Sequence, residues 1–497
     1  MRALILVPHP DDEINVAGST IIRLIRSGAE VFVAYSTNGD FDRTEELRAE
    51  EALEALKILG VDEPTKSPAA HVETYAPKNF RPWRQSEYTR KNFFADLESL
   101  IVELRADIIF CVDFDFHADH RALALAFDKV MSSILRRSDY RPTVYKKLAY
   151  ATAFTAPQDF LSDNLLSTPR PTIGLEAYDF DLIGKFNYVW SDRIRLPVPD
   201  DCREPSLRKN PIARAVFAHR SQRIQKNALA IINADEVFFE RRTDSITFDA
   251  EVRATSGDPI KVCDFQFLDV EDINASPPTF ANYYWAPTPD DSERRLTFEW
   301  AEPQTVRRIK IYGTLNGAID KLRITFDNMM VIDDIAIELG GAPTTIDLVR
   351  PIETARMDFE MLRSSGDAGI SEIEIFTSKR APAVLPPFIK IVGGDQFIFD
   401  FVMPSVIEQI DVGLYRFGFD GGIDWSVEGG SIETRDGDRI AIKLIDKVIT
   451  VRAEGAGMSD AITIRREGLI YFLRLRLKRL LERIYLHWSR HWTLRRH

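Results

Sequence analysis

Cysteine is the rarest residue in this chain, and long apolar runs are absent. Only three cysteines occur among 497 residues, namely Cys111, Cys202 and Cys263. An odd number at long spacings argues against a disulfide framework and a thiolate zinc site, so a reducing compartment is expected. No stretch of about 18 apolar residues is present, and the apolar run at residues 3–7 is too short for a secretory signal. We therefore expect a cytoplasmic protein without a membrane-spanning helix.

Positive charge is also in deficit, because 64 Lys and Arg face 76 Asp and Glu, which gives a net charge of −12. This balance disfavours nucleic acid as a partner, since such binding depends on neutralising phosphates. Hydrophobic residues make up 45% of the chain and charged residues 28%, as in a globular protein, so a wholly disordered chain is excluded. The length predicts about three domains.

The first half of the chain alternates between strand and helix patterns. Residues 3–7, 30–36 and 107–113 are short apolar runs, typical of strands that are buried on both faces. Apolar residues recur at helical spacing near residues 14–26, 47–59, 93–104 and 123–134. This alternation predicts an α/β domain over residues 1–245, with a Rossmann-like parallel sheet and helices on both faces.

The rest of the chain has a different pattern. Short alternating strands separated by turn residues fill residues 246–380, which predicts an all-β sandwich. A proline-rich stretch at residues 381–387 (APAVLPP) indicates a linker, and residues 386–465 predict a second β module. Neither β module carries a catalytic constellation of its own.

Two clusters of histidine and aspartate follow strands of the predicted sheet. Pro8-His9-Pro10-Asp11-Asp12-Glu13 comes directly after the first strand, and residues 117–120 (HADH) come just beyond the strand at 107–113. The carboxyl ends of parallel strands lie at one edge of the sheet, where doubly wound folds bind their ligands. The two clusters are therefore expected to meet in one cleft.

The residue types of these clusters predict a catalytic metal site. His9 and Asp12 lie three residues apart on a tight loop and can face one ion, and a histidine of the second cluster supplies a third ligand. Three ligands of mixed nitrogen and oxygen type leave a position for water, as in catalytic zinc sites, although another divalent ion can occupy such a site. Asp11 remains as a general base, and the leftover histidine, oriented by Asp119, can stabilise an oxyanion or protonate a leaving amine.

The HPDDE motif resembles the PIG-L-type family of zinc-dependent N-acetylglucosamine de-N-acetylases. Further elements of the same resemblance are the residues 37–40 (TNGD), Arg48-x-x-Glu51, the HADH cluster, which matches the family's HPDH, and His219-x-Ser221-Gln222. The resemblance covers about residues 1–225. Ala118 replaces the usual proline of the HPDH element, and about 270 residues follow the region of resemblance.

The resemblance implies a role for each matching residue. His9, Asp12 and His120 would be the zinc ligands, and Asp11 would be the general base. His117 would be the electrophilic and acid partner.

Two further roles follow from the same resemblance. Asp119 would tune His117, and Arg48 would contact the sugar. A surface ion pair between Arg48 and Glu51 is the alternative for that helix.

The middle β module resembles the galactose-binding-like, discoidin-type jelly roll. Tyr284-Trp285, the strands around residues 296–312 and residues 369–375 (GISEIEI) carry this likeness. Trp285 is either a sugar-stacking residue or a core tryptophan. The module at 386–465 resembles an immunoglobulin-like sandwich.

The last segment, residues 466–497, is predicted to be a basic amphipathic helix. Positions 465–497 hold ten Lys or Arg and two Glu, a net charge of +8, so the rest of the chain carries −20. Leu469, Leu473, Leu477, Leu480 and Trp488 recur at helical spacing. A basic amphipathic helix with aromatic anchors is typical of an anionic membrane surface, while packing on the acidic body or in an oligomer is the alternative.

These patterns favour one function. We expect a metal-dependent deacetylase that removes acetate from an N-acetylated amino sugar on a glycolipid or lipid-linked glycan precursor, at the inner face of a membrane. Two alternatives stay open: a deacetylase of a soluble sugar conjugate, and a catalytically silent glycan-binding scaffold.

Overall fold

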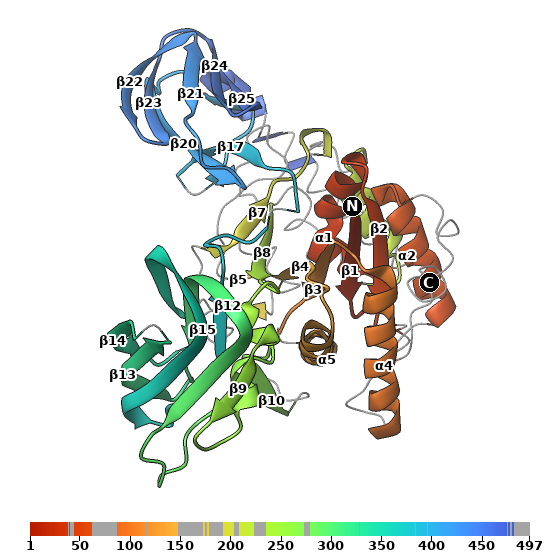
Figure 1. The fold of residues 1–497 in the computed structure, drawn as a ribbon. Helices are drawn as coiled ribbons and strands as arrows, with labels where there is room; N and C mark the ends of the chain where they lie inside the picture. The colour runs from red at the N-terminus through yellow and green to blue at the C-terminus, as the bar shows by residue number, and fades with distance from the viewer. Residues whose placement is uncertain are drawn as a thin grey trace.

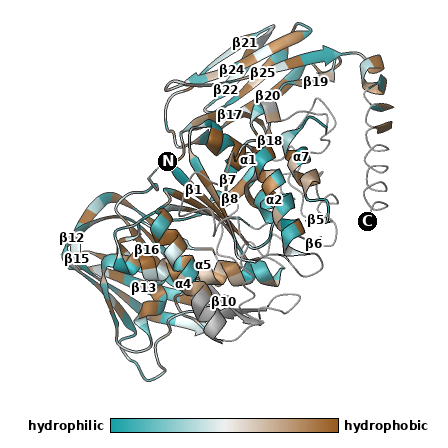
Figure 2. Ribbon diagram, turned by 90° about the vertical axis from the view of Figure 1, so that its right-hand side faces the viewer, coloured by the Kyte–Doolittle hydropathy of each residue, from teal (hydrophilic) through white to brown (hydrophobic). Residues whose placement is uncertain are grey.

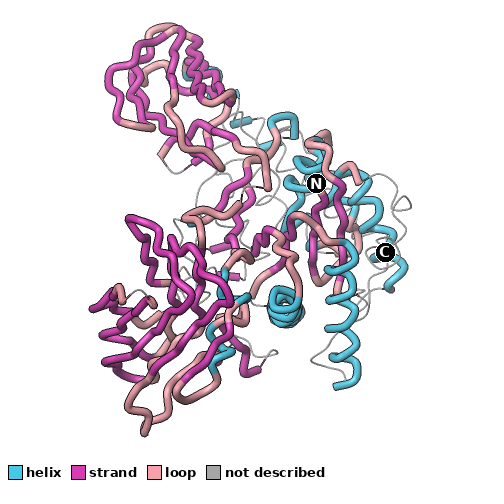
Figure 3. Tube along the Cα trace, viewed as in Figure 1, coloured by secondary structure: helices cyan, strands magenta, loops and turns pink. Residues whose placement is uncertain are grey.

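The computed structural model contains an α/β part followed by two β parts (Figures 1 and 3). It describes the following residues: 1–37, 39, 44–61, 87–114, 117–147, 172–173, 176–177, 192–202, 208–222, 235–272, 279–327, 329–340, 342–382, 384–394, 396–474, 476–477 and 480–481.

The N-terminal sheet has the strand order β2-β1-β3-β4-β8-β7. The bounds of its strands are β1 (Arg2–Val7), β2 (Glu30–Tyr35), β3 (Ile108–Val112), β4 (Thr143–Lys147), β7 (Ile194–Leu196) and β8 (Glu236–Arg241). Strands β2, β1, β3 and β4 are parallel, whereas β8 is antiparallel to β4 and β7 is antiparallel to β8. The predicted parallel sheet is confirmed for four strands, and the sheet as a whole is mixed. An antiparallel edge on a parallel sheet is common in α/β folds, and strand patterning alone does not give strand direction.

Helices cover both faces of this sheet, as predicted. Their bounds are α1 (Asp12–Arg26), α2 (Glu45–Leu59), α4 (Glu87–Leu104), α5 (Ala118–Arg137) and α7 (Pro211–Ala218). Helices α1, α2 and α7 contact one another, and α4 contacts α5. Lys146 of β4 bonds to Asp128 of α5 on one face, while Glu236 of β8 accepts from the backbone of Ser19 and Thr20 of α1 on the other. Short elements in the same part are β5 (Thr172–Ile173), β6 (Glu176–Ala177) and η3 (Asp200–Cys202).

Local sequence explains where the central elements begin and end. The apolar residues of β1 and β3 are buried on both faces of the sheet, which accounts for their continuous hydrophobic runs. Helix α2 begins after Thr44, whose side chain accepts from the backbone nitrogen of Leu47. It ends at Gly60, whose φ of 95° lies in the left-handed region that favours glycine.

The middle β part is built on one six-stranded antiparallel sheet. Its strands are β9 (Glu251–Ala254), β12 (Arg295–Tyr312), β13 (Gly317–Phe326), β14 (Val331–Ile337), β15 (Thr344–Gly366) and β16 (Glu372–Phe376). The long strands β12 and β15 shift register between Glu299 and Gln304, so each half of β12 pairs with a different outer strand, β9 or β16. A separate pair, β10 (Leu268–Asp272) and β11 (Thr279–Asn282), and the short helices η5 (Ile246–Asp249) and η6 (Pro259–Val262) complete this part.

Trp285 belongs to the core of the middle part. It is 1% exposed, and its indole nitrogen donates to the carbonyl oxygen of Ser256 at 2.7 Å. The alternative of a sugar-stacking Trp285 is therefore wrong, because its ring is not accessible to a ligand.

The last β part is a sandwich of two sheets. One sheet contains β17 (Phe388–Gly393), β18 (Gln396–Phe397), β20 (Gln409–Phe417), β22 (Gly430–Asp436) and β23 (Arg439–Leu444). The other contains β19 (Phe401–Pro404), β21 (Asp424–Glu428), β24 (Val448–Gly455) and β25 (Met458–Glu467). Their inner faces share one apolar core that includes Ile391, Ile442 and Val451. The predicted sandwich is confirmed, while the domain boundaries at residues 245, 380 and 465 stay predictions.

A helix at residues 469–474 follows β25 and leaves the sandwich at the end where β19 lies (Figure 2). Within the described part of the chain, no helix is both long and apolar enough to cross a membrane.

Candidate active site

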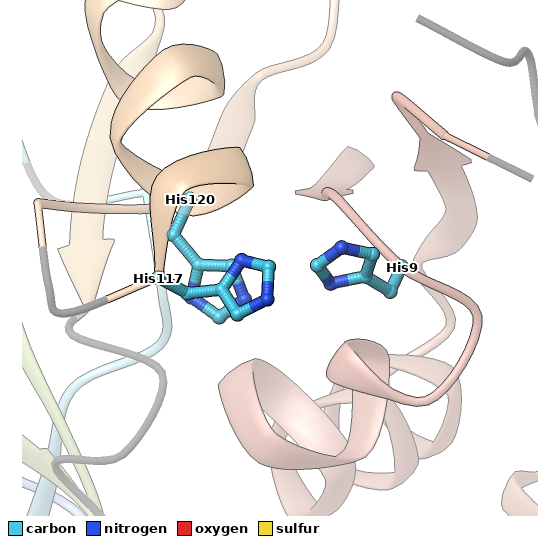
Figure 4. Close-up of side chains that lie close together, drawn as sticks. All are labelled: His9, His117 and His120. Carbon is cyan, nitrogen blue, oxygen red and sulfur yellow. The ribbon is translucent and has the colours of Figure 1, made fainter. Parts of the chain in front are cut away.

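The two histidine clusters lie at the carboxyl ends of adjacent parallel strands. The loop after β1 carries His9 and leads into α1, while the segment after β3 leads into α5, whose first turn carries His120. His117 is the N-cap residue of α5. The three imidazole rings face one another across the space between the loop and the helix (Figure 4). The predicted convergence of the clusters is thus observed.

The three histidines are close enough to share one ion. The ring centroids are 4.7 Å apart for His9 and His117, 4.9 Å for His117 and His120, and 5.5 Å for His9 and His120. One nitrogen of each ring lies within 4.8 Å of the others. The side chain of His120 is 1% exposed and that of His117 is 45% exposed. His120 therefore suits a ligand role, and His117 can reach a substrate, although this division of roles stays a prediction.

Asp12 ties the two predicted histidine ligands together. Its Oδ2 lies 2.8 Å from Nδ1 of His9 and 3.2 Å from Nε2 of His120. The Nε2 of His9 lies 2.6 Å from Oδ2 of Asp119, so both ring nitrogens of His9 face carboxylates. Nitrogen and oxygen donors that converge in this way are the ligand types that zinc and similar divalent ions accept, so the residues present fit such an ion.

The charges in the cluster stabilise one another. Burial alone would lower the pKa of His9, but hydrogen bonds with Asp119 and Asp12 raise it to about 9. Burial opposes ionisation of Asp12 and Asp119 as well, yet the neighbouring histidines lower the pKa of both carboxyl groups. In the absence of an ion the cluster thus holds ionised carboxylates against a protonated imidazole, and a metal ion bound there would replace the imidazole proton as the positive partner of the carboxylates.

Asp11 is held in a strained backbone conformation at the start of α1. Its φ is 147° and its ψ is −21°, a region that non-glycine residues rarely adopt. Its backbone nitrogen donates to Oε2 of Glu13 at 2.9 Å. Burial, and then the charge of Asp12, raise the pKa of Asp11 to about 6. A carboxylate with a pKa near neutrality is well matched to general-base work.

The buried side chain of Arg48 contacts the loop between β1 and α1. Its side chain is 6% exposed. The guanidinium donates to the carbonyl oxygen of Pro10 at 2.6 Å and to that of Gly39 at 3.1 Å. It also donates to Oδ1 of Asp11 at 3.1 Å. A side chain added at Gly39 would meet this guanidinium at 2.8 Å, and the φ of 69° at Gly39 also favours glycine. Arg48 thus holds Asp11 in place, and its contact with a sugar stays a prediction.

The remaining motif residues form two buried contacts close to Asp11, between Glu13 and His219 and between Glu51 and Ser221. Nε2 of His219 lies 2.7 Å from Oε1 of Glu13, and both side chains are fully buried. Glu51 accepts from the backbone nitrogen of Ser221 at 2.8 Å and from its hydroxyl at 2.7 Å. The segment after α7 is thereby fastened to α1 and α2, so the Arg48-Glu51 pair of the sequence is not a surface ion pair.

Glu13 is the residue that sequence reasoning missed as a site residue. It is part of the HPDDE motif, but the sequence does not show that its side chain turns inward to hold His219 and the backbone of Asp11. Of the TNGD residues, Thr37 is buried and donates to the carbonyl oxygen of Pro8 at 2.9 Å. Asn38 and Asp40 lie outside the described residues.

Comparison with known proteins agrees with the position of this site. Residues 4–131 match the family model described as PIG-L: GlcNAc-PI de-N-acetylase, which is about a quarter of the chain. No match to a curated protein was found.

Several solved structures are similar to parts of the chain. A triple mutant of a deacetylase involved in the teicoplanin biosynthetic pathway is 15% identical, covers 49% of this chain and 99% of its own, and has a TM-score of 0.31. The zinc-inhibited form of teicoplanin deacetylase Orf2 is 13% identical, with the same coverage of both chains and a TM-score of 0.29. The family 32 CBM from C. perfringens NanJ in complex with galactose is 18% identical, covers 26% of this chain and 94% of its own, and has a TM-score of 0.20.

Proposed function

We propose that this protein hydrolyses the acetamide of an N-acetylated amino sugar. The match of residues 4–131 to the PIG-L family model supports this proposal. The products are acetate and the free amino sugar. The observation that carries the proposal is that Oδ2 of Asp12 lies 2.8 Å from a ring nitrogen of His9 and 3.2 Å from one of His120. His117 and Asp11 belong to the same cluster of possible ligands.

His9, Asp12 and His120 would hold a divalent ion, with zinc as the first candidate. Such an ion supplies Lewis acidity, which lowers the pKa of a water molecule and polarises a carbonyl oxygen. These three ligands would place the ion at the carboxyl edge of the sheet. The side chain of His117 is exposed to solvent at this edge.

Asp11 removes the proton from the attacking water. Its raised pKa, about 6, suits this exchange near neutral pH, and Arg48 and Glu13 fix its direction. The new bond forms between the water oxygen and the acetyl carbon, and the carbon–nitrogen bond then breaks.

His117 serves the carbonyl oxygen and the leaving nitrogen. The backbone nitrogen of Asp119 donates to Nδ1 of His117 at 3.2 Å, which places the remaining ring proton on Nε2. That Nε2–H donates a hydrogen bond to the oxygen that gains charge, and its proton passes to the departing amine while the proton that Asp11 took from the water restores the ring, so both groups return to their starting state.

The sugar is proposed to be carried by a lipid, on the inner, cytoplasmic face of a membrane. The support is the basic segment after β25. Its net charge of +7 over residues 468–497 attracts an anionic leaflet, and the described turns at residues 469–474 leave Leu469 and Leu473 exposed instead of packed. Docking by this segment would keep the site near lipid-borne sugars.

An acetate-release screen tests this function. Purified protein supplied with Zn²⁺ is given an N-acetylglucosaminyl lipid in vesicles, a nucleotide-linked N-acetylglucosamine and chitooligosaccharides. Acetate is expected mainly from the lipid-borne substrate. A deletion of residues 468–497, which leaves β25 intact, should reduce this activity far more than activity on a short soluble analogue.

The outcomes separate the alternatives. Release from only the nucleotide-linked sugar, with no effect of the deletion, would identify a soluble-substrate deacetylase. No release from any substrate, with metal bound, would leave a silent glycan-binding scaffold. Asp139→Asn, at a position whose side chain is 92% exposed, is the control and should be fully active.

A further inference from the structure

A cluster of exposed apolar side chains surrounds the start of the C-terminal helix. It comes from three segments: the loop after β19, the loop before β24 together with the first residue of that strand, and the first turn of the helix. We call it the rim patch; its members are Val406, Ile407, Ile445, Val448, Leu469 and Ile470. Their exposed fractions run from 37% for Ile407 to 84% for Val406.

Backbone hydrogen bonds hold the two loops to the end of β25, two residues before the helix begins. The nitrogen of Ser405 donates to the carbonyl oxygen of Glu467 at 3.0 Å, and the nitrogen of Arg466 donates to the carbonyl oxygen of Lys447 at 2.8 Å. The guanidinium of Arg466 reaches the carbonyl oxygens of Ser405 at 2.6 Å and Leu444 at 3.2 Å. The rim patch is therefore one surface on a folded sandwich, from which the helix leaves (Figure 2).

These side chains do not belong to the apolar core of the sandwich. Its core is complete without them and is formed by inward residues such as Ile442, Ile449 and Ile464, which are fully buried. Isolated exposed apolar residues are ordinary, whereas a group of them gathered at one end of a module marks a surface that another body covers.

The charge of the adjoining segment indicates which body that is. Residues 465–497 carry +8 while the rest of the chain carries −20, and Arg474 and Arg476 are exposed on the described part of the helix. A second copy meeting at this patch would bring two +8 segments together. An anionic bilayer instead accepts both features, since apolar tips enter the interface and basic side chains meet the headgroups.

We propose that the rim patch and the C-terminal helix together form a rigid docking surface for an anionic membrane. This deepens, and rests on, the proposed action on a lipid-borne sugar. A helix alone gives one flexible attachment, whereas loops fixed to a sandwich define how the molecule stands on the bilayer. The last β module would thereby orient the protein relative to the bilayer.

The test compares two double variants of the full chain. Val406→Ser with Ile445→Ser removes two members of the rim patch, and Val349→Ser with Met329→Ser is the matched control. The control side chains are 97% and 81% exposed, but they lie on the middle β part. Binding is measured by sedimentation with vesicles of phosphatidylcholine and phosphatidylglycerol. The rim variant should bind at least about tenfold more weakly than the parent, because two aliphatic side chains no longer enter the membrane interface. The control should bind as the parent does.

Equal vesicle binding by parent and rim variant would overturn the proposal. So would a dimer, seen without vesicles, that the rim variant dissociates, because the patch would then join two copies. Acetate release from a short soluble substrate is followed in parallel and should be unchanged in both variants. If no acetate forms but the rim variant still loses vesicle binding, the membrane surface stands and the proposed reaction fails.

Discussion

Replacement of His219 by phenylalanine removes one partner of the fully buried His219-Glu13 pair, which lies next to Asp11. The imidazole lies 2.7 Å from Glu13, neither side chain is exposed, and the carboxylate of Glu13 also accepts from the backbone of Asp11. Burial opposes protonation of His219, but the charge of Glu13 raises its pKa above the usual value. Loss of one partner from a buried pair costs about 3–5 kcal/mol, because the remaining charge stays buried without compensation.

A double-variant cycle separates this cost from the positioning of Asp11. In Glu13→Gln with His219→Phe, the uncompensated charge is gone, so most of the lost free energy of unfolding should return. The backbone of Asp11, which has a φ of 147°, loses its carboxylate acceptor in the double variant, whereas in His219→Phe the carboxylate of Glu13 keeps that bond but loses the imidazole that positions it. We expect kcat to fall by roughly 10- to 100-fold in the single and double variants alike, because small misplacements of reacting groups are costly.

Urea unfolding and steady-state acetate release measure the two quantities. Arg195→Met is the control, since it breaks another buried pair, with Asp235 at 2.7 Å, near the far edge of the sheet. It should lose comparable stability and keep its kcat. The reasoning is refuted if His219→Phe leaves both stability and kcat unchanged, or if Arg195→Met lowers kcat equally.

Three further predictions address individual groups. His120→Ala should lose metal affinity, and unchanged affinity and stoichiometry in metal analysis would remove it from the ligand set. His117→Ala should keep the metal but lower kcat by about 10²–10³-fold through loss of an oxyanion donor; loss of the metal would instead make His117 a ligand. Lys147→Met should raise the free energy of unfolding by about 3 kcal/mol at pH 7, because burial lowers the pKa of Lys147 from 10.5 to about 8. This penalty is complete below pH 8 and is relieved as the pH rises toward 10.5, so a gain that is constant over this range would contradict it.

The sequence was sufficient to predict the elements that carry a periodic signal. The apolar runs at 3–7 and 107–113 are buried strands, and the loops after them bring His9 and His120 together, because adjacent parallel strands end at one edge. Strand direction was not readable, since β8 has the same apolar character whether it runs parallel or antiparallel to β4.

Side-chain direction is the second property that the sequence did not reveal. Arg48 and Glu51 lie one helical turn apart, a spacing that fits a surface pair, yet both are buried. Each finds its partner in a distant segment, Arg48 at Asp11 and Glu51 at Ser221. Such contacts depend on how α2 and α7 pack, which periodicity in one helix does not specify.

Asp11→Asn, assayed for metal content and acetate release in one preparation, tests most directly whether this cluster is a hydrolytic metal centre with Asp11 as its base. The prediction is one divalent ion per chain, as in the parent, with kcat lower by about 10²–10⁴-fold. Asp12→Asn, measured beside it, should lose the ion. Unchanged acetate release in Asp11→Asn, or loss of its metal while Asp12→Asn keeps its own, would contradict the account.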